Sequence, residues 1–240
     1  GRPSPAPVER VEIRGKALYV NGEPFFPVSI GFVAHWHYSL PEAGEKGFNL
    51  AETHGNKTDP QSFRMDIDEA YANGMYAEAS LSNGVWKDLE RVERIVKACR
   101  DAPGLLVWAL EDEPNHPNKP SYRYPPEQFK PVVDLIKRLD PLHPVYLNLA
   151  CGRLKDHQDY RDVADIHSDD IYPVPTSPLA HVAQYSDSVV KGAAGEPGWL
   201  WLQMSPLHGP GYTWEGGIPD RAPTMTEVRC TTYMAIAHGI

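Results

Sequence analysis

The densest group of ionisable side chains in this sequence follows a short apolar run. Residues 108–110 read Trp-Ala-Leu, and Glu111, Asp112 and Glu113 come directly after them. Three carboxyl groups placed together at the end of a strand repel one another, which raises the pKa of at least one of them. A carboxyl group that keeps its proton near neutral pH can act as a general acid. The alternative interpretation is an acidic loop that pairs with arginines such as Arg123 or Arg153.

Other polar and aromatic side chains occur where predicted strands end. They are Trp36, His54, Asn148, His167, Asp170, Tyr172 and Gln203. The carboxyl ends of the strands in a (β/α) barrel meet at one face, so these side chains would line a common cleft. Aromatic faces in such a cleft can stack on a ring-shaped ligand. The alternative for each of them is packing beneath a loop.

The elements that must position these residues alternate along the chain. Seven short apolar runs predict parallel strands at residues 25–32, 47–51, 74–79, 105–110, 145–149, 164–171 and 199–203. Apolar residues at helical spacing lie between several of them, at residues 59–70, 89–99, 129–139 and 224–238. Asp59 and the Thr224-x-x-Glu227 capping box mark two helix starts. Asn21-Gly22, between apolar residues, predicts an N-terminal β-hairpin.

Repeated strand–helix units predict an α/β fold, either a doubly wound sheet or a (β/α)8 TIM-type barrel. The sequence contains no G-x-G-x-x-G and no P-loop, which removes the main nucleotide-binding versions of the doubly wound sheet. We therefore predict a single barrel domain at residues 11–240, preceded by a flexible linker at residues 1–10. The eighth strand would begin near Gly239, so the barrel is expected to lack it. Two unpaired sheet edges would then favour a homo-oligomer.

Composition and net charge limit the kinds of partner that this protein can bind. The 240 residues carry a formal net charge of −9, which argues against a general nucleic-acid binder. No apolar run approaches the 18 residues that a membrane span needs. Cys99, Cys151 and Cys230 lie far apart, without metal-ligand spacing, and are expected to be buried free thiols. The Pro-rich start resembles a linker left after a leader is removed, which leaves the localisation open and slightly favours a secreted or periplasmic protein.

Four segments carry a resemblance to a family. Residues 18–26, 108–114, 170–173 and 199–203 resemble segments of TIM-barrel glycoside hydrolases, in the large clan whose acid/base glutamate follows the fourth strand. The clan carries Asn-Glu-Pro there, and this chain has Asp-Glu-Pro. The resemblance implies a glycosidase that acts on an oligosaccharide or glycoside and uses no cofactor. It also implies that Glu113 is the proton donor and that Asp112 replaces the asparagine that holds the sugar 2-hydroxyl.

The sequence departs from the clan at Gln203. A retaining member should end its seventh strand with a nucleophilic glutamate, and a neutral amide cannot form the glycosyl ester. Asp170 could act as the base or nucleophile instead, or Glu215 could reach in from the following loop. The third alternative is a barrel that binds carbohydrate without cleaving it.

The histidines suggest a rival hypothesis. His35-x-His37 resembles the metal-binding pair of the amidohydrolase superfamily, and His167 would be a further ligand. A zinc ion held there would activate water for hydrolysis. However, the fifth predicted strand ends near Asn148 rather than a histidine, and H-x-H is a weak signal. Histidines that line a cleft or contact sugar are the preferred interpretation, with no metal site.

Overall fold

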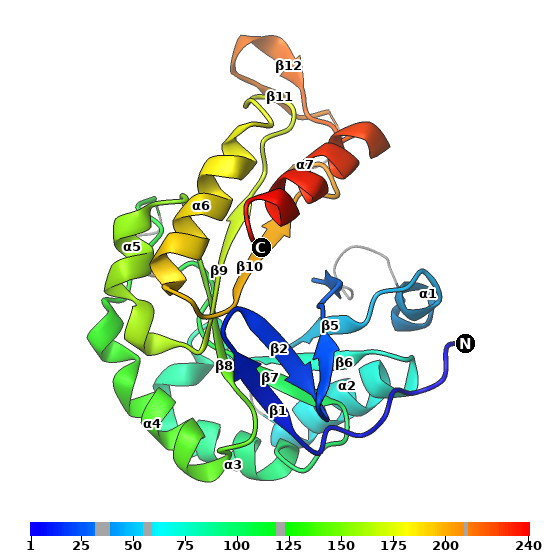
Figure 1. The fold of residues 1–240 in the computed structure, drawn as a ribbon, viewed down its shortest axis with the longest axis vertical. Helices are drawn as coiled ribbons and strands as arrows, with labels where there is room; N and C mark the ends of the chain where they lie inside the picture. Colours follow the sequence, from blue (N-terminus) through cyan, green and yellow to red (C-terminus); the bar gives the residue numbers. More distant parts are fainter. Residues whose placement is uncertain (32–38, 55–58, 119–122, 209–210) are drawn as a thin grey trace. The chain divides into compact units, whose positions relative to one another are not determined.

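Seven strands form one sheet in the computed structural model, which describes residues 1–31, 39–54, 59–118, 123–208 and 211–240 (Figure 1). The strand order is β10-β9-β8-β7-β6-β5-β4, and the pairs β4–β5, β5–β6, β6–β7, β7–β8 and β9–β10 are parallel. Order in space follows order in the chain without reversal. A doubly wound sheet reverses at a switch point, so this order is that of a singly wound, TIM-like fold.

The predicted strands are confirmed with small shifts at their ends. The sheet consists of β4 (Ser29–Ile30), β5 (Leu50–Thr53), β6 (Tyr76–Ser80), β7 (Leu105–Ala109), β8 (Val145–Leu149), β9 (Ile166–Ile171) and β10 (Gly198–Leu202). Every residue of β6, β7 and β8 is buried, which is the expected pattern for strands covered on both faces. The first predicted strand, at residues 25–32, is shorter in the structure, and its last residue lies outside the described part.

Contacts within the chain divide it into two compact units. The first unit comprises Gly1–Asp112, Pro125–Leu147 and Val163–Asp165, and the second comprises Glu113–Tyr124, Asn148–Asp162 and Ile166–Ile240. Each unit is described by itself below. The interpretation of residues 11–240 as one barrel domain stays a prediction.

Helices of the first unit begin where the sequence indicates. It contains α1 (Leu40–Glu45), α2 (Pro60–Ala72), the 3-10 turn η1 (Val85–Lys87), α3 (Leu89–Cys99), the 3-10 turn η3 (Pro126–Gln128) and α4 (Lys130–Leu139). The Asp59 side chain accepts the Gln61 N–H at 2.9 Å and so caps α2. Pro131 is accommodated because it lies in the first turn of α4, where no intrahelical N–H is needed. Apolar residues on one face of α3 and of α4 are buried.

A small antiparallel sheet precedes the parallel one. It contains β1 (Val11–Arg14), β2 (Ala17–Val20) and β3 (Glu23–Phe25), in that order. Asn21 and Gly22 form the two-residue turn between β2 and β3 with φ of 54° and 87°, so the hairpin prediction is confirmed. The segment before β1 is hydrogen-bonded to the same unit. Tyr71 Oη donates to Pro5 O and Tyr76 Oη donates to Ala6 O, both at 2.8 Å.

The second unit contains the later elements. They are α5 (Leu154–Asp159), the 3-10 turn η4 (Arg161–Val163, whose last residue belongs to the first unit), β9, α6 (His181–Ala193), β10, β11 (Thr213–Trp214), the 3-10 turn η5 (Glu215–Gly217), β12 (Ile218–Pro219) and α7 (Met225–Ala237). Gly192 permits the close approach of α6 to α5, since an added Cβ would lie 2.2 Å from His157 Cβ. In the described part of the chain, no helix has the length and apolar character needed to cross a membrane.

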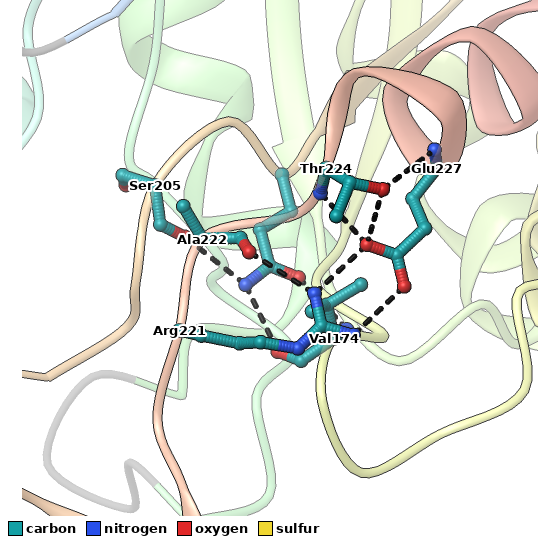
Figure 2. A network of polar contacts seen from close by, with 7 residues as sticks. Val174, Ser205, Arg221, Ala222, Thr224 and Glu227 are labelled. Atoms are coloured by element: carbon teal, nitrogen blue, oxygen red, sulfur yellow. Dashed lines mark hydrogen bonds and ion pairs between the residues drawn. The ribbon is translucent and has the colours of Figure 1, made fainter.

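The capping box of α7 is confirmed in detail (Figure 2). Thr224 Oγ1 accepts the Glu227 N–H at 3.3 Å, and Glu227 Oε2 accepts the Thr224 N–H at 2.7 Å. Arg221 also donates to both Glu227 oxygens at 2.8 Å. The hydrogen bonds from Arg221, then those from Thr224, lower the pKa of Glu227 to about 2.

We predict that Thr224→Ala lowers the free energy of unfolding by about 1 kcal/mol, because the first turn of α7 loses an N–H acceptor. Chemical denaturation checks this value. Thr232→Ala is the control: Thr232 lies inside the same helix and donates only to Val228 O, so its loss should cost less than the loss of Thr224. Equal effects of the two variants would contradict a specific role for the cap.

Candidate functional site

The three consecutive acids have different structural roles. Glu111 is buried, and its carboxylate accepts the N–H groups of Asn83 at 2.9 Å and Gly84 at 3.0 Å. Trp86 Nε1 donates to the same carboxylate at 2.8 Å. Asn83 and Gly84 both have positive φ, which turns two consecutive N–H groups toward one anion. Glu111 therefore holds the β6–α3 loop to the end of β7 and is occupied by structural hydrogen bonds.

Two further acids of the first unit lie inside strands. Glu52 on β5 and Glu78 on β6 are direct partners in the parallel register, so their side chains leave the same face of the sheet. Glu78 is 1% exposed, and its Oε2 has no hydrogen-bond partner among the described residues. Burial, followed by the charges of Glu52 and Asp112, raises the pKa of Glu78 well above its ordinary value of 4.5. His54 Nε2 lies 3.2 Å from Glu52 Oε1.

Glu113 begins the second unit in an unusual backbone conformation. Its φ is 48°, in the left-handed region that residues other than glycine rarely adopt. Its N–H donates to Asn148 O at 3.1 Å, and its carbonyl accepts the His116 N–H at 3.1 Å. Asn115 ties the same loop to the end of β8, because its side chain donates to Ala150 O at 2.8 Å and accepts the Ala150 N–H at 2.9 Å. These bonds fix the direction in which the half-buried Glu113 side chain leaves the chain.

Cys151 marks the point where the acids of the second unit come together. Burial raises the pKa of the Cys151 thiol, the nearby Arg153 lowers it, and the negative charges of Asp169, Glu113 and Asp170 raise it further. Glu113, from the loop after β7, and Asp170, from β9, therefore act on one thiol. The acid/base roles that the sequence suggests for Glu113 and Asp170 stay predictions.

Asp169 is the buried member of this group. It is inaccessible to solvent, and its carboxylate accepts the Gly152 and Asp170 N–H groups at 3.0 and 2.9 Å. His157 Nε2 lies 3.0 Å from Asp169 Oδ2, and both side chains are fully buried. Burial raises the pKa of Asp169 in spite of these bonds. Asp169 supports the neighbouring backbone, while Asp170 is partly exposed.

Gln203 is held by backbone groups. Its Oε1 accepts the Val174 N–H at 2.9 Å, and its Nε2 donates to the carbonyl groups of Val174 and Ser205 at 3.0 Å. Figure 2 shows Val174 and Ser205 in this network. The side-chain amide of Gln203 is buried and connects the loop after β9 to the loop after β10. Its role in binding substrate stays a prediction.

The other predicted residues take different positions. His167 is buried near the start of β9, with Nε2 3.1 Å from Glu196 Oε2, whereas Asp170 lies near the end of the same strand. Asn148 is buried at the end of β8, and Tyr172 is 40% exposed after β9. Trp36, His35 and His37 lie outside the described residues. Within the described ranges, no three His, Cys, Asp or Glu side chains are placed to share a metal ion.

Glu52, Glu78, Cys151, His157 and Asp169 were not among the residues that the sequence singled out as a site. A signal was present for the two glutamates. Each is a charged residue inside a short run that otherwise reads as a buried strand, and such a residue needs an explanation. Asp169 gave the same signal, as an acid inside the predicted strand at residues 164–171, whereas His157 gave none, because α5 and β9 bring it to Asp169 only in three dimensions.

Comparison of the structure with solved structures gives high-probability matches to glycosidases. A GH2 beta-galacturonidase from Eisenbergiella tayi bound to galacturonate aligns with a TM-score of 0.60 and 16% identity, over 86% of this chain and 40% of that chain. A beta-D-glucuronidase from Dictyoglomus thermophilum aligns with a TM-score of 0.65 and 12% identity, over 95% of this chain and 44% of that chain. A beta-glucuronidase from Bacteroides uniformis aligns with a TM-score of 0.59 and 12% identity, over 95% of this chain and 31% of that chain.

These similarities define the fold class, which this chain shares with glycoside hydrolases. The chain spans less than half the length of each of these three proteins. Comparison of the sequence with protein-family models and with curated proteins finds no match.

We predict that Glu111→Ala lowers the free energy of unfolding by about 2–5 kcal/mol, because a buried indole N–H and two backbone N–H groups lose their acceptor. Urea denaturation followed by tryptophan fluorescence checks both the stability and the environment of Trp86. Asp112→Ala, one residue further along at an exposed position, is the matched control and should change the stability by much less.

We predict that an alkylating reagent modifies the exposed Cys230 first, Cys151 more slowly and the folded protein's Cys99 hardly at all. Burial raises the pKa of Cys99 to about 12, and the reactive species is the thiolate. Asp170→Asn should accelerate the modification of Cys151, because it removes a negative charge that raises the pKa of that thiol. Mass spectrometry of digested samples measures each rate, with Cys230 as the internal control. An unchanged Cys151 rate in Asp170→Asn would contradict the grouping.

Proposed function

We propose that this chain is the barrel part of a glycoside hydrolase and that Glu113 is its general acid/base. The observation that supports the proposal is that Glu113 and Asp170 both belong to the second unit, where the negative charges of both raise the pKa of the Cys151 thiol. Glycosidic bonds are typically cleaved by two carboxyl groups that flank the bond, and these two residues supply such a pair. The fold shared with glycosidases supports the same reaction class.

The backbone around Glu113 suits a proton donor. The left-handed conformation and the hydrogen bonds through Asn148 and Asn115 hold the direction in which the Glu113 side chain leaves the backbone. Its half-buried position leaves the carboxyl group within reach of a substrate.

Asp170 is our choice for the second carboxylate. Gln203 cannot act as a nucleophile, and its amide is engaged with the backbone. Glu215 is exposed in the turn between β11 and β12. Asp170 is partly exposed and follows Asp169, which is fixed by His157 and the Gly152 N–H. In this proposal Asp169 positions the strand end, and Asp170 faces the substrate as base or nucleophile.

We predict that Glu113→Gln lowers the hydrolysis rate of a natural glycoside by about 10²–10⁴-fold without unfolding the protein, because the amide cannot donate the proton. A panel of p-nitrophenyl and natural glycosides, followed by product detection, measures the rate, and circular dichroism checks the fold. Glu215→Gln is the matched control and should retain the rate.

Asp170→Asn should also lose turnover. The anomeric form of the first product, read by NMR, then tells whether Asp170 is a nucleophile (retention) or a base (inversion). Unchanged turnover in Glu113→Gln would contradict the assignment of Glu113 as the general acid/base. Saturable sugar binding without turnover in the unmodified protein would favour a binding barrel, and inhibition by a chelator would favour the metal-dependent hydrolase.

A further inference from the structure

We infer that Glu52, Glu78 and Asp112 of the first unit form a recognition site for the hydroxyl groups of an uncharged sugar ring, and that this site rejects a ring bearing a carboxylate. The choice of a sugar as the ligand rests on the proposed function. The binding itself requires only the first unit's side chains and does not depend on turnover.

Within the described residues, the buried Glu78 carboxyl group has an unmet hydrogen bond. Its side chain is 1% exposed, and Oε2 has no partner in the part of the chain that the structure describes. An unpaired buried polar group costs free energy, so nearly all such groups in proteins have partners. Each such group in a folded protein calls for an explanation, such as a bound water, ion or ligand. The missing partner of Glu78 is accounted for if a ligand supplies it.

The surroundings of Glu78 are acidic. Glu52 is its direct partner on β5, about 4.8 Å away at the backbone level. The side chains range from the exposed Asp112 through Glu52, whose side chain is 12% exposed, to the buried Glu78. The charges that act on Glu78, those of Glu52 and Asp112, are both negative. The group therefore offers a graded set of acceptors that leads from solvent to a buried carboxyl.

The hydrogen-bonding capacity of these three acids indicates the chemistry of the ligand. A divalent cation would be the obvious occupant of three carboxyl groups, but the described residues contain no three ligating side chains placed around a common point. The carboxyl oxygens of Glu78, Glu52 and Asp112 are hydrogen-bond acceptors, and Oε2 of Glu78 has no partner among the described residues. A hydroxyl group both donates and accepts, so neighbouring hydroxyls of a sugar ring match this set. A carboxylate has no proton to donate, and it would be repelled by Glu52 and Asp112.

This inference separates the chain from the proteins that share its fold. One of them is described as bound to galacturonate, and others are glucuronidases. We expect the ligand of this chain to be a neutral hexose or a neutral glycoside.

The test uses matched pairs of sugars that differ only at C6, glucose with glucuronate and galactose with galacturonate. Each is titrated into the full chain at pH 7 and followed by isothermal calorimetry or ligand-observed NMR. We expect at least one neutral sugar to bind at least tenfold more tightly than its uronate. Equal or tighter binding of both uronates overturns the inference, as does the absence of binding by either neutral sugar. Binding that requires added Mg²⁺, Ca²⁺ or Zn²⁺ also overturns it, because it would indicate a cation site.

Variants of Glu78 separate a binding role from a structural one. Glu78→Leu should weaken binding of the neutral sugar at least tenfold while raising the unfolding midpoint, because it replaces an unpaired buried carboxyl by an apolar side chain. Glu78→Gln keeps a donor and an acceptor and should bind within threefold of the unmodified protein. A structural role predicts the opposite for Glu78→Leu, namely lower stability with binding kept in the folded fraction. Glu69→Gln, an exposed acid on α2, is the control for loss of one charge and should change neither quantity.

Glu52→Gln tests the charge argument without relying on a buried substitution. It should lower the ratio of neutral-sugar to uronate affinity, since one repelling charge is removed, and an unchanged ratio would contradict the inference. The readouts also distinguish this inference from the proposed function. Retained turnover in Glu113→Gln together with selective binding of neutral sugars would remove only the catalytic assignment, whereas loss of turnover in Glu113→Gln without this selectivity would remove only the recognition site.

Discussion

The Glu111 carboxylate, buried and bonded to two backbone N–H groups and the Trp86 indole, is the interaction on which the geometry of the first unit's acids depends. It links the end of β7 to the loop after β6, and Glu78 lies on β6. Charge-assisted hydrogen bonds of this kind are about twice as strong as neutral ones, so the link is stiff. Trp86 in turn stacks on Phe129, with ring centroids 4.3 Å apart, which extends the constraint to the start of α4. Of the three consecutive acids, Glu111 is thus engaged in structural hydrogen bonds, and these bonds also hold the neighbouring residues in place.

The second unit follows the same physical rule with different residues. A buried carboxylate, Asp169, accepts backbone N–H groups and contacts a buried histidine, while the next residue along the strand stays accessible. In both units a buried acid accepts backbone N–H groups, and the adjacent acid is more exposed to solvent. The pairs are Glu111 with Asp112 and Asp169 with Asp170. Burial and hydrogen bonding, rather than residue type, separate the two roles, because all four side chains carry the same functional group.

Much of the fold could be predicted from the sequence. The seven parallel strands, the Asn21-Gly22 hairpin and the caps at Asp59 and Thr224 follow from local chemistry, which acts over a few residues and is therefore readable from short segments. The site was predicted less completely. Acids at strand ends are visible in the sequence, but nothing local distinguishes Glu111 from Glu113, since the partners of Glu111 lie 25–28 residues away. Gln203 was identified by its position, while its backbone contacts with Val174 and Ser205 required the folded loops.

The sequence by itself determined which residues could form strands, helices and caps, and where carboxyl groups would gather along the chain. Periodicity and capping depend on neighbours within a few positions, so they need no knowledge of the fold. Only the tertiary structure decided which carboxyl group is saturated, which has a buried oxygen without a partner among the described residues and which stays accessible. Those properties depend on desolvation and on donors brought from distant segments, as the pairing of Glu52 with Glu78 and the contact between His157 and Asp169 show. The chemical character of this protein therefore follows from where the fold places its acids, more than from how many it has.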